Sequence, residues 1–314
     1  MAKRKVQQPP AHPSKTDAPS LSVDVLDRFT EGDLETWRAL SADLDELHAI
    51  LYYEIQPQRM RRKQEIVDAL AARNPQPLEF SDWVRIVDYR YANSPLSVVG
   101  SLRGIGGRFN IGPDTDQSIN PPFPALYVGD SFQTAYRERY QLGAQSSGAA
   151  NGLTPEDMAL SVSSTSVRVR GRVERSVDVS DPKNLVAICK VLAKIKMPES
   201  ARRLMRRLKL RPRQVFMITS AAQLEVALQD HNWRARPTQF GIPSISQQFA
   251  ELAKSAGYEG IIYRSTKNPI GKCVALFTDN IGSDRTFVEL IDPSPDTVVH
   301  RRLDLDSADD LMRC

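Results

Sequence analysis

The stretch GIGGRFNIG, residues 104–112, places four glycines and one arginine within nine residues. Turns this rich in glycine often pass close to a bound phosphate, because glycine puts no side chain between backbone and ligand. A P-loop would continue with lysine and then serine or threonine, and no such pair follows. A dinucleotide-binding GxGxxG would need glycine at Phe109 and a helix directly afterwards, but the helix-breaking run NIGPDTDQSINPPFP begins at the next residue. Both motifs are excluded, and the stretch predicts a constrained turn that presents Arg108, either to solvent or to a ligand.

The segment that follows places two candidate residues on predicted elements. PALYVGDSFQTAYRERY, residues 124–140, predicts a buried strand that carries Tyr127. A helix that begins at Asp130 or Ser131 then carries Glu138. Taken singly, Tyr127 is explained as a core aromatic residue and Glu138 as a solvated helix charge.

A third segment lies far along the chain. GYEGIIYRSTKNPIGKCVALF, residues 257–277, predicts two apolar strands joined by a polar turn that begins at Ser265. A serine at this place is most often an ordinary turn residue. The three segments therefore point to a site only in combination.

Five segments in this order resemble the RES-domain family, which is named for its arginine, glutamate and serine. They are YRYANSPLS (89–97), GIGGRFN (104–110), ALYVGDSFQTAYRE (125–138), GYEGIIYRS (257–265) and CVALF (273–277). The resemblance runs from Trp83 to Asn280. Known members resemble NAD-cleaving toxins of toxin–antitoxin pairs, with a fold similar to ADP-ribosyltransferases. The resemblance implies this fold, NAD as the substrate and a cognate antitoxin protein as a partner.

The resemblance also implies roles for individual residues. Arg108 matches the arginine of the family's GGR motif, Glu138 its glutamate and Ser265 its serine, and these three are the implied catalytic residues. The residues implied to bind NAD are Arg90, from the YR element, Arg108, Tyr127 and Asn110. The chain departs from the family pattern in Phe109, where tryptophan is more usual, and in longer runs before Tyr127 and between Glu138 and Ser265. A toxin role and a housekeeping role both remain open.

The chemistry of NAD cleavage agrees with these residue types. Arginine can hold the pyrophosphate with a bidentate fork, and a tyrosine can stack on the nicotinamide ring. The transition state resembles an oxocarbenium ion, so a carboxylate near the anomeric carbon stabilises it. Ser265 would hydrogen-bond ribose or amide atoms and orient Glu138. Nicotinamide leaves as a neutral molecule from a cationic ring, so no metal and no cofactor beyond NAD is expected; the acceptor is water, phosphate or a protein.

The order of predicted elements favours an α+β fold with a mixed or antiparallel sheet. Predicted strands alternate irregularly with helices, which argues against a doubly wound sheet. One of these predicted strands is QVFMITS, residues 214–220. The predicted division is a disordered basic tail over 1–22, a helical extension over 23–77, a RES-like catalytic domain over 78–293 and a C-terminal tail over 294–314 that adds little to the core.

The composition is that of an ordinary globular protein. The 314 residues are 41% hydrophobic and 25% charged, with a mild net charge of +4. Three cysteines and four histidines are scattered without metal-ligand spacing, which predicts neither disulfides nor a zinc site. The basic start has no apolar segment behind it, and no run approaches the roughly 20 apolar residues of a membrane span. We therefore expect a cytoplasmic protein without membrane contact.

Two basic clusters support a different class of function. ARRLMRRLKLRPR, residues 201–213, holds seven basic residues in thirteen and predicts a basic amphipathic helix; RMRRK occupies 59–63. The outer face of that helix is either solvated or a docking surface for an acidic partner or nucleic acid. The alternative function is a non-enzymatic module that binds nucleic acid or protein. It ranks below NAD cleavage, because neither cluster is interleaved with aromatic residues.

Overall fold

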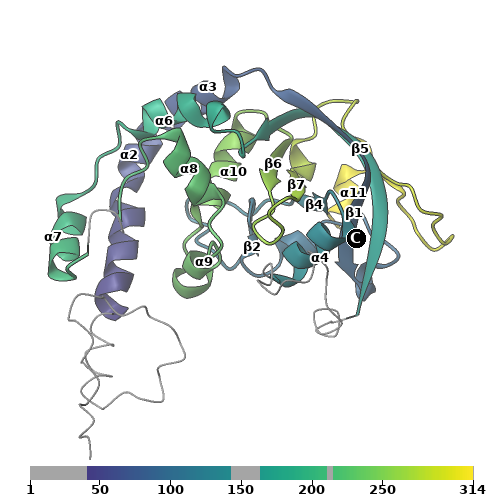
Figure 1. The fold of residues 1–314 in the computed structure, drawn as a ribbon, viewed down its shortest axis with the longest axis horizontal. Coiled ribbons are helices and arrows are strands. Elements are labelled where there is room, and N and C mark those ends of the chain that lie inside the picture. Colours follow the sequence, from purple (N-terminus) through teal and green to yellow (C-terminus); the bar gives the residue numbers. More distant parts are fainter. Residues whose placement is uncertain (1–40, 143–162, 211–214, 314) are drawn as a thin grey trace, which may run out of the picture. The chain divides into compact units, whose positions relative to one another are not determined.

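The computed structural model describes residues 41–142, 163–210 and 215–313 (Figure 1). The chain divides into two units, 1–44 and 45–314, and the second contains the sheet. The predicted tail over 1–22, the first part of the extension over 23–77 and residues 211–213 of the basic segment lie outside the described residues. No helix in the described part is long and apolar enough to cross a membrane.

A seven-stranded sheet organises the second unit. Its order is β1-β4-β7-β6-β5-β8-β9, and β1 also pairs with β5, so that five of these strands form a closed ring of pairings. Among the described strands, β5 and β6 pair in parallel and the others are antiparallel. The predicted α+β fold with a mixed sheet is confirmed. The strands are β1 Gln76–Asp88, β4 Leu126–Gly129, β5 Ser164–Asp178, β6 Gly260–Arg264, β7 Lys272–Leu276, β8 Phe287–Leu290 and β9 Arg302–Leu303, and a separate hairpin joins β2 Gly106–Gly107 to β3 Asn110–Ile111.

Helices surround this sheet, and several begin at capping residues that the sequence supplies. Ser131 caps α4, as one of the two predicted caps, and Ser220 and Ser244 form capping boxes for α8 and α10. The α-helices are α2 Gln56–Arg61, α3 Lys63–Ala71, α4 Phe132–Tyr140, α6 Val186–Leu192, α7 Glu199–Arg207, α8 Ala221–Leu228, α9 Ala235–Phe240, α10 Ile245–Ser255 and α11 Ala308–Leu311. Shorter helical turns are η2 Ile50–Glu54, η3 Tyr89–Tyr91, η4 Val99–Leu102, η5 Pro182–Leu185 and η6 Thr278–Asn280.

The sheet has a hydrophobic core on each face. Along β7, Cys273 and Ala275 belong to one core and Val274 and Leu276 to the other, as the alternation of side chains along a strand requires. The first core also contains residues of α3, α6, α8 and α10. The α3 residues Ile66 and Leu70 are part of it, so the end of the predicted extension packs on the sheet domain. The domain boundaries themselves stay predictions.

The structure corrects two expectations. No strand forms within 215–220: the backbone N–H groups of Thr219 and Ser220 bind the Gln223 side chain and so serve the start of α8 rather than a ladder. The expectation that 294–314 adds little to the core is also wrong. Leu303 and Leu311 are fully buried, because β9 pairs with the edge of β8 and Leu311 accepts a hydrogen bond from Val98 N at 3.0 Å.

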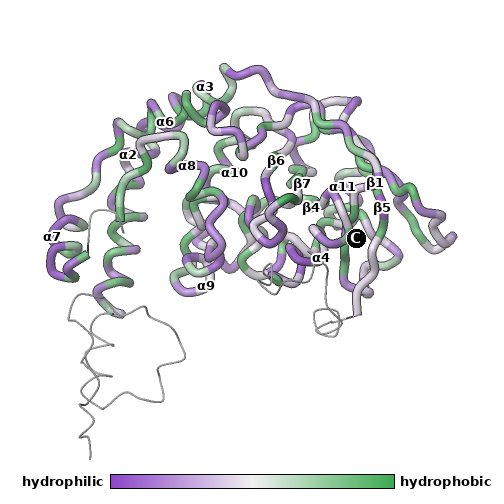
Figure 2. The backbone as a smooth tube through the Cα atoms, viewed as in Figure 1, coloured by the Kyte–Doolittle hydropathy of each residue, from purple (hydrophilic) through white to green (hydrophobic). Residues whose placement is uncertain are grey.

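The predicted basic amphipathic helix is α7 Glu199–Arg207, which carries both hydrophilic and hydrophobic residues (Figure 2). Its apolar face buries Ala201 and Leu204 against Leu47. On the outer face, Arg206 pairs with Glu199 at 2.8 Å and Arg207 with Glu46 at 3.3 Å. These carboxylates neutralise part of the charge on which the alternative function rests.

Candidate active site

A cavity of about 380 Å³ lies where β1, β4 and α4 meet the β2–β3 hairpin. Four of the predicted site residues line it: Arg90, Arg108, Tyr127 and Glu138. The other two, Asn110 and Ser265, are buried and hydrogen-bond to residues that line the cavity. The structure therefore brings all six into one region, although they come from segments far apart in the sequence.

The glycine stretch forms the tight β2–β3 hairpin. Gly106 has a φ of +82°, in the left-handed region that favours glycine. A Cβ on Gly107 would lie 2.5 Å from Tyr127 Oη and 2.7 Å from Asn110 Oδ1. Gly106 and Gly107 also line the cavity. The glycines thus allow the hairpin backbone to pack closely against the Tyr127 and Asn110 side chains, and the same hairpin lines the cavity.

We expect Gly107→Ala to lower the free energy of unfolding by about 1–3 kcal/mol, because the added methyl group overlaps the Tyr127 and Asn110 side chains. Urea unfolding measures the change. Gly282→Ala is the matched control, since a Cβ there has no heavy atom within 4 Å and should change stability by less than about 1 kcal/mol. Equal stabilities of the two variants would contradict this view of the hairpin.

Tyr127 and Asn110 hold the hairpin against β4. Tyr127 Oη donates to Asn110 Oδ1 at 2.9 Å and accepts from Phe109 N at 2.9 Å. Asn110 Nδ2 donates to the carbonyl oxygens of Ser101 and Phe123 at 2.7 and 3.0 Å. Burial raises the pKa of Tyr127, so its hydroxyl stays protonated. Asn110 is fully buried and orients Tyr127, rather than forming part of the cavity wall.

Glu138 is oriented by the turn that begins at Ser265. Its Oε1 accepts from Ser265 Oγ at 2.7 Å and from Thr266 N at 2.9 Å. Ser265 Oγ itself accepts from Lys267 N and Asn268 N at 3.1 and 2.9 Å, so its single proton must point toward Glu138. Oε2 has no hydrogen-bond partner among the described residues and is the oxygen left for a ligand.

Arg108 joins three parts of the pocket. Its Nη1 donates to the carbonyl oxygens of Leu228 and Asp230 at 3.4 and 2.8 Å, and its Nη2 donates to Thr266 Oγ1 at 2.7 Å. The side chain is buried, and within the described chain Nε has no partner. Arg108 therefore uses three of its five N–H donors to fix the hairpin to the α8–α9 loop and to the Ser265 turn, and Nε–H and one Nη2–H are left for a ligand.

The cavity carries an excess of positive charge. Arg90 and Arg139 share one carboxylate, Asp88, with Arg90 Nη2 at 3.0 Å. Arg85 donates to three carbonyl oxygens; burial, and then the charge of Arg139, lower its pKa to about 10, which leaves it charged at neutral pH. Of the described residues that line the cavity, the carboxylates are Asp88 and Glu138, against six arginines: Arg85, Arg90, Arg103, Arg108, Arg139 and Arg234. This balance favours an anionic ligand.

Sequence reasoning missed several residues of the pocket wall. Trp233 and Arg234 come from the α8–α9 loop, and Tyr263 from β6. The run HNWRARP, residues 231–237, offered a signal, since it places an aromatic residue and an arginine directly before α9 and a second arginine in its first turn. Arg103 and Arg139 had no distinguishing pattern. Among the residues described, no group of three or more His, Cys, Asp or Glu side chains could hold a metal ion.

Comparison with known proteins matches the part of the chain that contains these site residues. The family model described as RES domain matches residues 82–306, which enclose the region of resemblance from Trp83 to Asn280. One similar solved structure is the M. tuberculosis MbcT–MbcA toxin–antitoxin complex, with 16% identity and a TM-score of 0.38 over 79% of this chain and 97% of that chain. The search among curated proteins found no significant match.

Proposed function

The chain belongs to the RES-domain family, and from this membership together with the pocket we propose that it cleaves the nicotinamide–ribose bond of NAD, as the toxin of a toxin–antitoxin pair in the cytoplasm. The observation that carries the chemistry is the free Oε2 of Glu138 in a cavity rich in arginine. A pocket of this charge suits a pyrophosphate, and the carboxylate suits the cationic transition state.

Each site residue has a role in this reaction. The pyrophosphate is held by the arginines, including the free Nε–H of Arg108, and Arg90 contributes from the exposed rim. The Tyr127 ring orients the nicotinamide. The glycosidic C–N bond breaks with its electron pair going to nicotinamide, which leaves as a neutral molecule. Glu138 stabilises the positive charge that develops on the ribose, and Ser265 keeps Glu138 in place.

Three acceptors complete the reaction in different ways. Water yields ADP-ribose and releases a proton, inorganic phosphate yields phosphorylated ADP-ribose, and a protein side chain yields a modified protein. Purified protein is incubated with NAD, with phosphate and with candidate acceptor proteins, and nicotinamide is followed by chromatography. No release under any condition would overturn the proposal. Salt-sensitive binding of polynucleotide without nicotinamide release would favour the alternative, non-enzymatic function instead.

The toxin role has its own test. Controlled expression in cells should stop growth and deplete NAD together, and co-expression of a cognate antitoxin should restore both. Normal growth with normal NAD would leave only a housekeeping role for the enzyme.

We expect Ser265→Ala to lower kcat roughly tenfold with little change in KM, because Glu138 loses the hydroxyl that fixes its position. A tenfold loss corresponds to about 1.4 kcal/mol, which is a reasonable value for one hydrogen bond to a charged group. Steady-state nicotinamide release measures both constants. Ser265→Thr keeps the hydroxyl and should recover most of kcat; equal losses for the two variants would argue for a purely structural role.

A further inference from the structure

The α8–α9 loop contributes to the cavity although it lies outside the five segments that resemble the RES family. Trp233 and Arg234, at its end, both line the cavity. The carbonyl oxygens that accept from Arg108 belong to Leu228, the last residue of α8, and to Asp230 of the same loop. Hydrogen bonds from Arg108 therefore join the loop to the β2–β3 hairpin at the wall of the cavity.

Trp233 holds two cations near one ring. The guanidinium carbons of Arg108 and Arg234 lie 5.8 and 5.1 Å from the centroid of the Trp233 ring. Such contacts are favourable for each cation and offset part of the repulsion between the two. Trp233 is only 4% exposed, so the ring is a fixed platform rather than a mobile surface group.

Arg234 differs from Arg90, Arg108 and Arg139; of the described arginines that line the cavity, only Arg103, which lies over the Tyr91 ring, likewise has no ion pair and no side-chain hydrogen bond. Arg90 and Arg139 pair with Asp88, and Arg108 donates three hydrogen bonds. In the part of the chain that the structure describes, Arg234 has no carboxylate within ion-pair distance and no side-chain hydrogen bond; its guanidinium lies over the Trp233 ring, and the charge of Glu138 acts on it from a greater distance. Partial burial, followed by the charges of Arg108 and Arg139, lowers the pKa of Arg234, as expected for a cation held among cations.

A guanidinium in this position can bind an anion without first breaking a hydrogen bond or ion pair. Its planar fork matches two oxygens of a phosphate, and no protein group competes for the donors. Arg108, in contrast, uses three of its five N–H donors to hold the protein together, and only Nε–H and one Nη2–H are left. The two residues therefore suit different tasks: Arg108 mainly holds the loop and the Ser265 turn, and Arg234 supplies the open fork.

We propose that Arg234 is a substrate-binding residue that grips the diphosphate of a nucleoside diphosphate group, with Trp233 and Arg108 as its positioning residues. This inference deepens the proposed function and rests on it for the identity of the full substrate. The binding step alone needs only a ligand with a nucleoside diphosphate part, so ADP serves as a probe that no cleavage reaction can confuse.

Isothermal titration calorimetry of ADP tests the inference at one fixed salt concentration. We expect Arg234→Gln to weaken ADP binding at least tenfold, and Arg234→Lys, which keeps the charge without the fork, to fall between this variant and the parent. Arg285→Gln is the matched control, because Arg285 is exposed and its carboxylate partner, Glu174, lies outside the cavity. Parent-like ADP affinity in Arg234→Gln, at an unchanged melting temperature, would overturn the inference.

The outcomes separate this inference from the proposed function. If the parent protein binds ADP through Arg234 but releases no nicotinamide from NAD, the inference stands and the proposed function fails. If the parent protein does not bind ADP, the inference is wrong. If NAD is cleaved, Arg234→Gln should raise KM by a similar factor and leave kcat within about twofold, because a contact to the diphosphate does not change when the glycosidic bond breaks.

Discussion

Glu138→Gln is expected to lower kcat for nicotinamide release by about 10²–10³-fold. The amide oxygen can still accept from Ser265 Oγ and Thr266 N, so the side chain keeps its position. The NH₂ group then replaces Oε2, and the negative charge that faces the developing cation is lost. The change therefore removes electrostatic stabilisation of the transition state while it preserves the shape of the pocket. Steady-state and single-turnover assays of nicotinamide release measure the loss.

Two controls isolate the charge of Glu138. Glu289→Gln removes a carboxylate on β8 that pairs with Arg170 at 2.8 Å, and should leave kcat unchanged. ADP binding by Glu138→Gln should match or exceed that of the parent, since a negative charge leaves the cavity. Parent-like turnover of Glu138→Gln would remove Glu138 from the reaction.

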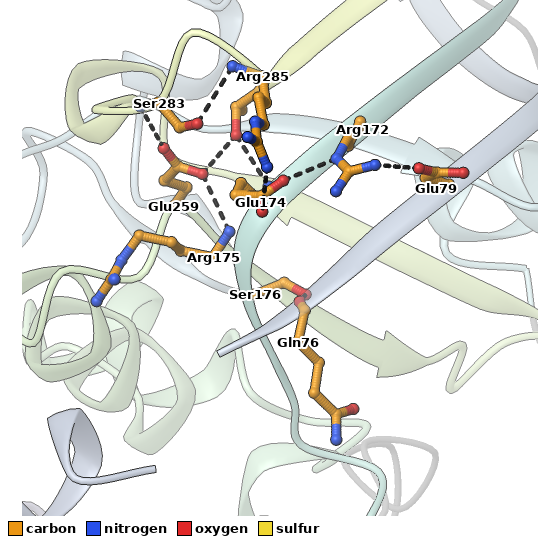
Figure 3. A network of polar contacts seen from close by, with 10 residues as sticks. Gln76, Glu79, Arg172, Glu174, Arg175, Ser176, Glu259, Ser283 and Arg285 are labelled. Atoms are coloured by element: carbon orange, nitrogen blue, oxygen red, sulfur yellow. Dashed lines mark hydrogen bonds and ion pairs between the residues drawn. The ribbon is translucent and has the colours of Figure 1, made fainter. Parts of the chain in front are cut away.

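Glu259→Gln is expected to lower the free energy of unfolding by about 2–4 kcal/mol. Glu259 is 1% exposed, and its carboxylate lies beside Arg175 and Ser283, near the charged side chains Arg172 and Glu174 of β5 (Figure 3). Its Oε1 accepts from the backbone N–H groups of Gly282 and Ser283 at 2.9 Å each. Its Oε2 accepts from Arg175 N at 3.1 Å and from the Thr286 hydroxyl.

An amide cannot satisfy this arrangement. In either orientation of the glutamine, its NH₂ group faces at least one backbone N–H, whose direction is fixed by the chain. Two hydrogen-bond donors then face each other in the protein interior, and neither has an acceptor. Urea unfolding measures the difference. Glu79→Gln is the control in the same view: Glu79 is 70% exposed in its ion pair with Arg172, and should change stability by at most about 1 kcal/mol. A stability of Glu259→Gln close to that of the control would contradict the reasoning.

The parts of the site that depend on local sequence signals could be predicted from the sequence. Ser131 at the start of α4, Tyr127 on β4 and the turn at Ser265 each follow from neighbouring residues. The order of the motifs predicted the family, which the match to the RES-domain model confirms. Once these elements are placed, the Ser265–Glu138 hydrogen bond agrees with the predicted steering role. The assigned roles in NAD binding and catalysis stay predictions.

Other features depend on contacts that no local pattern encodes. Arg234 and Trp233 reach the cavity because the α8–α9 loop binds Arg108 from a segment more than a hundred residues away. The apolar run at 215–219 has strand propensity, but the backbone N–H groups of Thr219 and Ser220 donate to the Gln223 side chain at the start of α8. Leu303 is buried because β9 pairs with the edge of β8, and Leu311 is buried on α11, where its carbonyl accepts from Val98 N. In each case tertiary packing outweighs local preference.

The hydrogen bond from Ser265 to Glu138 spans 127 positions of the chain. A ribosome synthesises Glu138 long before Ser265, and β6 and β7, which frame the turn, later than β4 and α4. A nascent chain that stops short of this turn has the glutamate without the group that orients it. The candidate site is thus assembled only after the segment that carries Ser265 has been synthesised and β6 and β7 have joined β4.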